Sequence, residues 1–310
     1  MGQISPRILR TKIIPPPRNP RTLTRPRVSA ALREAFEYRL TILQAGAGYG
    51  KSTALAELAA EIRPLVWYQV NEEDNDPLVF LLHLFHAVRE ALPDLPIPLL
   101  DIWDGAQGPL LWRGVLDQFL NALSAHADGP ILFVIDDAHI VTESGEVAQI
   151  LDRLIGLAPA SVHVLLSGRP TISLPTLARW KSQGEALLLD QSILTFTESE
   201  TSALFSGRYG LELTGEEVDS LLSFTEGWAI ALQLIWQSIR SQSSVGLEFP
   251  AHWQAESLDA LFDVLTREVF ARHPADIRDF LLVTATLRDL APEACDALRL
   301  AAGRPSGDSA

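Results

Sequence analysis

The stretch "LTILQAGAGYGKSTAL", residues 40–55, decides the fold of this chain. It begins as a short apolar run, continues as a turn with three glycines, and ends in residues that favour a helix. Glycine lets the backbone curl tightly enough for several N–H groups to point at one anion, and the dipole of the following helix adds to the attraction. The stretch therefore predicts a buried strand, a phosphate-binding turn and a helix, in that order.

The turn fits the nucleotide-binding signature G-x-x-x-x-G-K-[ST] at every position but the first, where Ala45 replaces glycine. In that signature the lysine contacts the β- and γ-phosphates and the hydroxyl binds Mg²⁺, so we assign these roles to Lys51 and Ser52. The predicted nucleotide-binding residues are consecutive: Ala45, Gly46, Ala47, Gly48, Tyr49, Gly50, Lys51, Ser52 and Thr53. The alternative is a glycine-rich turn that only caps the helix.

The lysine itself supports the nucleotide site. The chain has 22 arginines and only three lysines, so a lysine at residue 51 departs from the general preference for arginine. A compact ammonium fits inside a phosphate loop where a planar guanidinium would not. We expect the ligand to be ATP or ADP, because the sequence has no Asn/Thr-Lys-x-Asp motif of the kind that reads guanine.

A second strand completes the predicted site. A phosphate loop predicts a strand, neighbouring the first, that ends in an acidic residue beside the Mg²⁺, and "PILFVIDDAHIV" at residues 130–141 provides one. We assign Asp136 to the metal side, together with Ser52, and Asp137 to polarising the attacking water. The alternative is a pair of exposed turn acids that cap the next segment of the chain.

The strand at residues 162–167 ends in "SGRP", which places Arg169 at the carboxyl edge of the predicted sheet. Ligands of open α/β sheets bind at this edge. We therefore expect Lys51, Asp137 and Arg169 to form the catalytic set, with Arg169 sensing the γ-phosphate. The alternative for Arg169 is a solvated loop arginine.

Alternating strands and helices indicate the fold class. Apolar runs bounded by turn residues lie at 40–44, 65–70, 131–136, 162–167 and 186–189. Helical patterns lie at 52–62, 78–91, 110–125 and 147–156. We predict an α/β P-loop NTPase domain over residues 37–190, with a parallel five-stranded sheet and helices on both of its faces.

Helical signals dominate the remainder of the chain. Two Ser/Thr-x-x-Glu capping boxes, Thr197 with Glu200 and Thr214 with Glu217, indicate a helical lid over residues 191–253. Apolar residues at helical spacing continue over 254–300, and residues 301–310 have no core-forming side chains and are predicted to be disordered.

Charge and composition limit the partners. The net charge of −14 argues against this chain wrapping nucleic acid by itself. Residues 1–36 form a basic, proline-rich arm, and its prolines predict an extended path. The arm could be a solvated tail, a clamp along the domain or a lip over a ligand. A single cysteine and the lack of a long apolar run predict a cytoplasmic location without a membrane segment.

Several blocks of sequence together resemble a known family. The blocks are "ILRTKIIPPP", "LTRPRV", "AGAGYGKST", "VNEEDNDPLVF", "FVIDDAHIV", "LLSGRPTISLPTLAR", "TEGWAIALQL" and "FLLVTATLRDL". Their order and spacing are similar to those of the signal-transducing ATPases with numerous domains (STAND), and among them the large, MalT-like LuxR-family regulators. The resemblance spans nearly the whole chain.

The resemblance implies an ATP/ADP- and Mg²⁺-binding signalling switch with slow hydrolysis. It also implies a lid in which Gly227 and Trp228 contact the nucleotide, and a partial winged-helix unit over residues 254–300. In such regulators an inducer and ATP favour self-association, and DNA is bound through a C-terminal domain that is absent from this chain. The inducer is unknown.

Other functions stay open at this point. The chain ends within the expected winged helix, so a fragment, a truncated gene product and a stand-alone switch are all compatible with it. A non-catalytic adaptor that keeps ADP or ATP as a structural ligand belongs to a different functional class. A kinase that uses the same loop is a third possibility, although nothing resembles a lid over an acceptor substrate.

Overall fold

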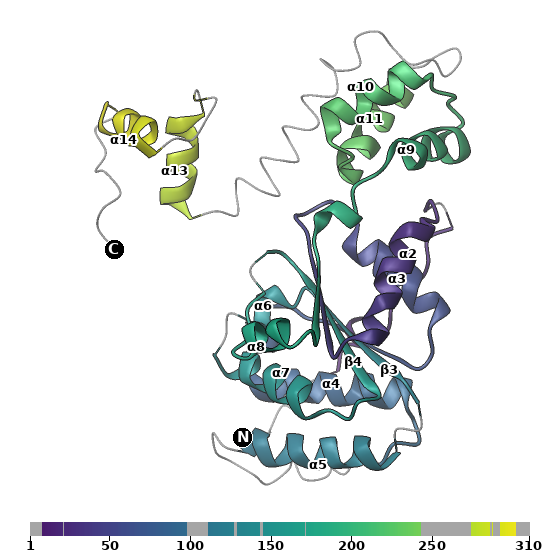
Figure 1. Ribbon diagram of the computed structural model, residues 1–310, viewed down its shortest axis with the longest axis vertical. Coiled ribbons are helices and arrows are strands. Elements are labelled where there is room, and N and C mark those ends of the chain that lie inside the picture. The colour runs from purple at the N-terminus through teal and green to yellow at the C-terminus, as the bar shows by residue number, and fades with distance from the viewer. Residues whose placement is uncertain are drawn as a thin grey trace, which may run out of the picture. The chain divides into compact units, whose positions relative to one another are not determined.

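The computed structural model describes residues 8–20, 22–97, 111–126, 129–142, 145–170, 172–242, 274–285, 287 and 292–301. The chain divides into two compact units, Met1–Leu232 and Gln233–Ala310. Figure 1 draws the described elements of both as ribbons. This division does not coincide with a boundary expected from the sequence, and the boundaries of the NTPase domain, the lid and the later helical unit stay predictions.

A parallel sheet of five strands forms the centre of the first unit. Its strands are β1 (Leu40–Gln44), β2 (Leu65–Gln69), β3 (Ile131–Asp136), β4 (Val162–Gly168) and β5 (Ala186–Leu189). They lie in the order β2-β3-β4-β1-β5, and all four pairings are parallel. Every residue of β3 is buried, as expected for a continuous apolar strand covered on both sides. The predicted fold class is confirmed.

One expectation about the sheet is wrong. The strand that ends in Asp136 does not neighbour β1, because β4 lies between them and pairs with both. The sequence pattern could not give this order, since β3 and β4 are both apolar runs that fit beside β1. The consequence for the site is direct: Ser167 and Gly168, at the end of β4, lie between the glycine turn and Asp136.

Helices cover both faces of the sheet. The helices and helical turns between the strands are α3 (Lys51–Glu61), η2 (Glu72–Asn75), α4 (Pro77–Ala91), α5 (Leu111–His126), α6 (His139–Thr142), α7 (Gly145–Leu157) and α8 (Leu177–Ser182). Phe133 of β3 belongs to the core formed with α4, α5 and α7. Val134, the next residue, belongs to the core on the other face, formed with α3. This alternation follows from the two-residue period of a strand.

The N-terminal arm contains helices, contrary to the extended path predicted from its prolines. They are α1 (Arg10–Ile13), α2 (Pro26–Arg33) and η1 (Glu34–Glu37). Pro26 occupies the first position of α2, where the missing N–H costs nothing and the fixed φ suits a helix. The arm packs against the sheet domain: Ile13 and Val28 are buried, and the Lys12 ammonium lies 2.7 Å from a buried Asp74 carboxylate oxygen. Among the three alternatives, the described part of the arm is a clamp.

Helices follow the sheet, as the capping boxes predict. They are η4 (Gln191–Ile193), α9 (Glu198–Leu204), the π-helical η5 (Phe205–Tyr209), α10 (Gly215–Thr225) and α11 (Ala229–Gln242). Both capping boxes are present, with Thr197 and Thr214 accepting bonds from the backbone N–H groups of Glu200 and Glu217. Among the described residues, no helix is long and apolar enough to cross a membrane.

The second unit contributes two further described helices, α13 (Ala275–Thr284) and α14 (Pro292–Ala301). Cys295 of α14 is buried, in keeping with a small core residue. The first part of the expected winged-helix unit, residues 254–273, and the expected disordered tail beyond residue 301 lie outside the described residues.

Candidate functional site

The glycine turn joins β1 to α3 and has the backbone that its sequence requires. Gly48 and Gly50 have φ angles of +76° and +86°, in the left-handed region that glycine enters without strain. Ala45, the departure from the signature, is buried with its methyl group in the core beside α3, and its N–H donates to the carbonyl of Gly168 at 3.1 Å. Alanine at this position therefore fits the loop.

Lys51 lies over the start of the turn. Its Nζ donates to the carbonyl oxygens of Ala45 at 2.8 Å and Gly46 at 2.9 Å. Burial lowers the pKa of the ammonium, while the nearby charges of Asp137 and Asp136 oppose that effect. A positive charge is thus held at the mouth of the loop, beside N–H groups and the helix start that also favour an anion.

Ser52 and Asp136, which are 84 residues apart in sequence, meet at this point. The Ser52 hydroxyl donates to a carboxylate oxygen of Asp136 at 2.7 Å. Asp136 has no exposed surface, and burial raises the pKa of its carboxyl, an effect that the bond from Ser52 reduces. The second carboxylate oxygen accepts the Asp137 N–H at 3.1 Å.

This pair of oxygen ligands fits Mg²⁺. Within the described part of the chain, Asp136 forms no ion pair, and no group of three or more His, Cys, Asp or Glu side chains gathers into a metal site. Mg²⁺ needs only one or two protein oxygens when phosphates and water complete its shell, unlike zinc. A buried carboxylate with a hydroxyl at hydrogen-bonding distance is such a set.

The other two predicted catalytic residues lie around the same ammonium. Asp137 follows β3 with a φ of +59°, which is uncommon for a residue with a side chain. Its charge opposes the lowering of the Lys51 pKa, whereas the charge of Arg169, one residue beyond β4, adds to it. Both side chains are therefore within electrostatic reach of the turn. Thr53 is exposed in the first turn of α3.

The turn before α11 rests on the phosphate loop. The Trp228 indole N–H donates to the carbonyl of Ala47 at 3.0 Å, and the Ile230 N–H donates to the carbonyl of Gly48 at 3.1 Å. A Cβ on Gly48 would lie only 2.6 Å from Cγ2 of Ile230, so the loop and this turn fit together only with glycine there. Trp228 thus contacts the loop that is expected to hold the nucleotide.

Comparisons with known proteins show which proteins this chain resembles. The AAA domain family matches residues 34–174. The HTH-type transcriptional regulator MalT of Yersinia enterocolitica is 30% identical over 285 residues, and that of Serratia proteamaculans is 29% identical over 285 residues. The chain contains a MalT-like region with a P-loop NTPase fold. The alignments cover 91% of this chain but only 31% of each regulator, so the chain spans about a third of the length of these relatives.

A solved structure supports the fold of the MalT-like region. The Walker-type ATPase of Pyrococcus abyssi superposes with a TM-score of 0.59 and 14% sequence identity, covering 94% of this chain and 87% of that structure. At this identity the similarity shows the fold alone.

Two residues of the MalT-like region that shape the site were missed by sequence reasoning. Ile230 contacts the loop through its backbone N–H, and its side chain lies beside Gly48; no motif in the sequence indicates either contact. In the sequence Arg25 is only one charge of a basic arm, although it is bound to the segment between β5 and α9. Arg25 and Arg27 flank Pro26, the residue that starts α2. This pair of arginines at a helix start was the only feature of the sequence that could have drawn attention to Arg25.

Proposed function

We propose that this chain is the nucleotide-binding part of a MalT-like, LuxR-family regulator, and that it binds ATP or ADP with Mg²⁺ and hydrolyses ATP slowly. The observation that carries the proposal is the 2.7 Å bond between the Ser52 hydroxyl and the buried Asp136 carboxylate at the end of the glycine turn. A turn that served only as a helix cap would have no need for a buried carboxylate at this place.

Each residue has a distinct part in this proposal. The N–H groups of residues 46–53 cradle the phosphates, and Lys51 exchanges its bonds to two loop carbonyls for phosphate oxygens. Ser52 and Asp136 would hold Mg²⁺, and the bound ion would neutralise part of the phosphate charge. Asp137 accepts a proton from the attacking water, and Arg169 contacts the γ-phosphate.

The remaining parts of the regulator proposal concern the longer protein. We propose that the ATP-bound form self-associates in the cytoplasm in response to an inducer. DNA binding would belong to a domain outside this chain, since the net charge of −14 disfavours DNA binding by this part itself.

The test measures nucleotide retention and phosphate release. We expect purified protein to retain ADP or ATP and to release phosphate slowly, and Lys51→Ala to lose both properties. Lys181→Ala is the matched control, because Lys181 is an exposed lysine on α8. Asp137→Asn should bind nucleotide normally but release no phosphate.

Two results would change the proposal. If phosphate release by the wild type equals that of Lys51→Ala while nucleotide is retained, the chain is the non-catalytic adaptor. If neither protein retains nucleotide, the nucleotide site itself is refuted.

A further inference from the structure

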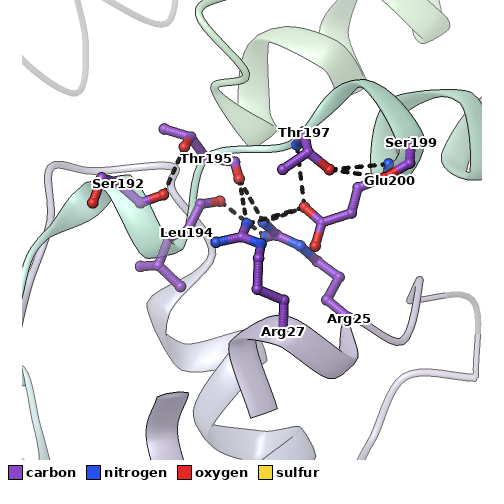
Figure 2. A network of polar contacts seen from close by, with 8 residues as sticks. All are labelled: Arg25, Arg27, Ser192, Leu194, Thr195, Thr197, Ser199 and Glu200. Atoms are coloured by element: carbon purple, nitrogen blue, oxygen red, sulfur yellow. Dashed lines mark hydrogen bonds and ion pairs between the residues drawn. The ribbon is translucent and has the colours of Figure 1, made fainter. Parts of the chain in front are cut away.

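The segment that joins the sheet to the helices after it is held by an arginine of the N-terminal arm. We call residues 190–197, between β5 and α9, the connector. Arg25 donates to the carbonyls of Leu194 at 2.9 Å and Thr195 at 2.7 Å, and to the Glu200 carboxylate at 2.8 Å (Figure 2). Its guanidinium carbon also lies 4.1 Å from the ring centroid of Phe196.

This arrangement is more than a surface ion pair. The side chains of Arg25 and Glu200 are only 12% and 13% exposed, whereas most exposed pairs contribute little. Burial lowers the pKa of the Arg25 guanidinium, and the bond to Glu200 opposes the shift. Arg27 adds bonds to the carbonyl of Thr195 at 2.9 Å and to Glu200 at 3.2 Å. Two guanidinium groups thus fix backbone carbonyls that have no strand or helix partner.

The connector is in turn packed against the turn that touches the phosphate loop. The Phe196 N–H donates to the carbonyl of Gly227 at 2.9 Å. A Cβ on Gly227 would lie 2.5 Å from the carbonyl oxygen of Phe196, so the two backbones are in direct contact. The next residue, Trp228, donates to the carbonyl of Ala47. A continuous set of contacts therefore leads from Arg25 through the connector to the phosphate loop.

Arg25, at the other end of this set of contacts, is itself fixed to the sheet domain. Arg25 directly precedes α2, and Val28 and Leu32 of α2 are in the same core as Leu55 and Leu58 of α3, the helix that starts at the phosphate loop. The arginine is thus anchored on the same side of the sheet as the loop. Movement of the connector away from α2 would require Arg25 to release both carbonyls and Glu200.

We propose that Arg25 is a positioning residue that clamps the connector and thereby keeps the Trp228 turn on the phosphate loop, so that it slows the release of bound nucleotide. The effect on nucleotide release rests on the proposed function, whereas the contacts that form the clamp do not depend on it. The segment that moves when nucleotide leaves is the connector with the helices after it. Arg25 acts through Phe196 and Gly227 rather than by touching the ligand.

The experiment compares Arg25→Ala with Arg33→Ala, in which an arginine of the same helix region loses only an exposed partner, Glu61. Release of a fluorescent ADP analogue is followed by stopped-flow after mixing with excess ADP. We expect release from Arg25→Ala to be roughly tenfold faster or more, since several charge-assisted bonds are lost. Arg33→Ala should match the wild type, and Arg25→Lys should be intermediate because lysine lacks the planar fork.

A second measurement needs no nucleotide. The Ile230 amide is bonded to the carbonyl of Gly48, so its hydrogen exchange reports directly on the contact between the turn and the loop. We expect this amide to exchange faster in Arg25→Ala than in the wild type, while amides of β3 stay unchanged. Glu200→Gln removes one charge of the cluster and serves as a milder variant if Arg25→Ala does not fold.

The outcomes separate the two proposals. If the wild-type protein binds no nucleotide, the proposed function is refuted. The hydrogen-exchange rate of the Ile230 amide still tests the clamp in that case, because this measurement needs no nucleotide. Unchanged release together with unchanged Ile230 exchange, in Arg25→Ala or in Glu200→Gln, overturns the clamp. Equal acceleration in Arg33→Ala also overturns it, because general loosening of the arm would then explain the effect.

Discussion

Gly48→Ala tests how firmly the turn before α11 is seated on the phosphate loop. The substitution introduces a methyl group at a φ of +76°, and its Cβ would lie 2.6 Å from Cγ2 and 2.9 Å from Cβ of Ile230. Gly50→Ala is the matched control, since Gly50 has a φ of +86° and nothing within 4 Å of the added Cβ. The two variants share the backbone strain and differ in the clash.

The expected cost follows from these two contributions. Placing alanine in the left-handed region costs about 1–2 kcal/mol in either variant. Overpacking adds about 1–3 kcal/mol for Gly48→Ala alone. If the turn lifts off instead, the two hydrogen bonds from Trp228 and Ile230 are lost, at about 0.5–1.5 kcal/mol each, which gives a similar total. Gly48→Ala should therefore unfold at a lower temperature than Gly50→Ala, by about 2–4 °C per kcal/mol of difference.

The assay is thermal unfolding without nucleotide, combined with hydrogen exchange at the Ile230 amide. Ile230→Ala removes the closest clashing atom, so it should narrow the difference between the two glycine variants. If Gly48→Ala and Gly50→Ala are equally destabilised, and Ile230→Ala leaves the stability of Gly48→Ala unchanged, the turn is not packed on the loop in solution.

Two further predictions concern ion pairs of the arm. Lys12→Met leaves the fully buried Asp74 carboxylate without its ammonium and should lower the free energy of unfolding in urea by about 3–5 kcal/mol. Arg10→Met breaks an exposed ion pair and should lower it by at most about 1 kcal/mol. Similar losses in the two variants would contradict the buried position of the Lys12 pair. Burial alone would raise the pKa of Glu200, but the bonds from Arg25 and Arg27 outweigh it and lower the pKa below the ordinary 4.5. Its stabilising contribution is therefore complete above pH 4.5 and is lost as the pH falls through the lowered value. The difference in unfolding free energy between wild type and Glu200→Gln should shrink only under acidic conditions, and a difference that already shrinks near neutral pH would argue against the cluster.

The elements that the sequence predicts best are those whose signal is local. Apolar runs bounded by turns locate all five strands, and the signal is clearest in β3, which is buried along its whole length. The glycine turn and the meeting of Ser52 with Asp136 could also be predicted, since the nucleotide-binding signature has particular residue types at fixed places. The start of α4 also has a local signal, because Asp76 accepts the N–H of Leu78 and Pro77 occupies the first helical position.

The features that sequence reasoning missed depend on contacts between distant segments. The place of β4 between β1 and β3 is set by packing of the whole sheet, to which no local pattern refers. The helical path at Pro26 was missed because proline breaks a helix interior but suits its first position. The bonds from Arg25 to Leu194 and Thr195 span about 170 residues and use backbone carbonyls, which leave no trace in residue type.

We propose that the turn after β1 binds nucleotide phosphates, with Mg²⁺ held by Ser52 and Asp136. Calorimetric titration of ATP, with and without Mg²⁺, into wild type and Ser52→Ala measures this binding. We predict that the wild type binds ATP more tightly with Mg²⁺ than without it, and that Ser52→Ala loses most of this difference. Equal wild-type affinity in the presence and absence of Mg²⁺ would contradict a metal site at Ser52 and Asp136, and the absence of any binding heat would contradict the nucleotide site itself.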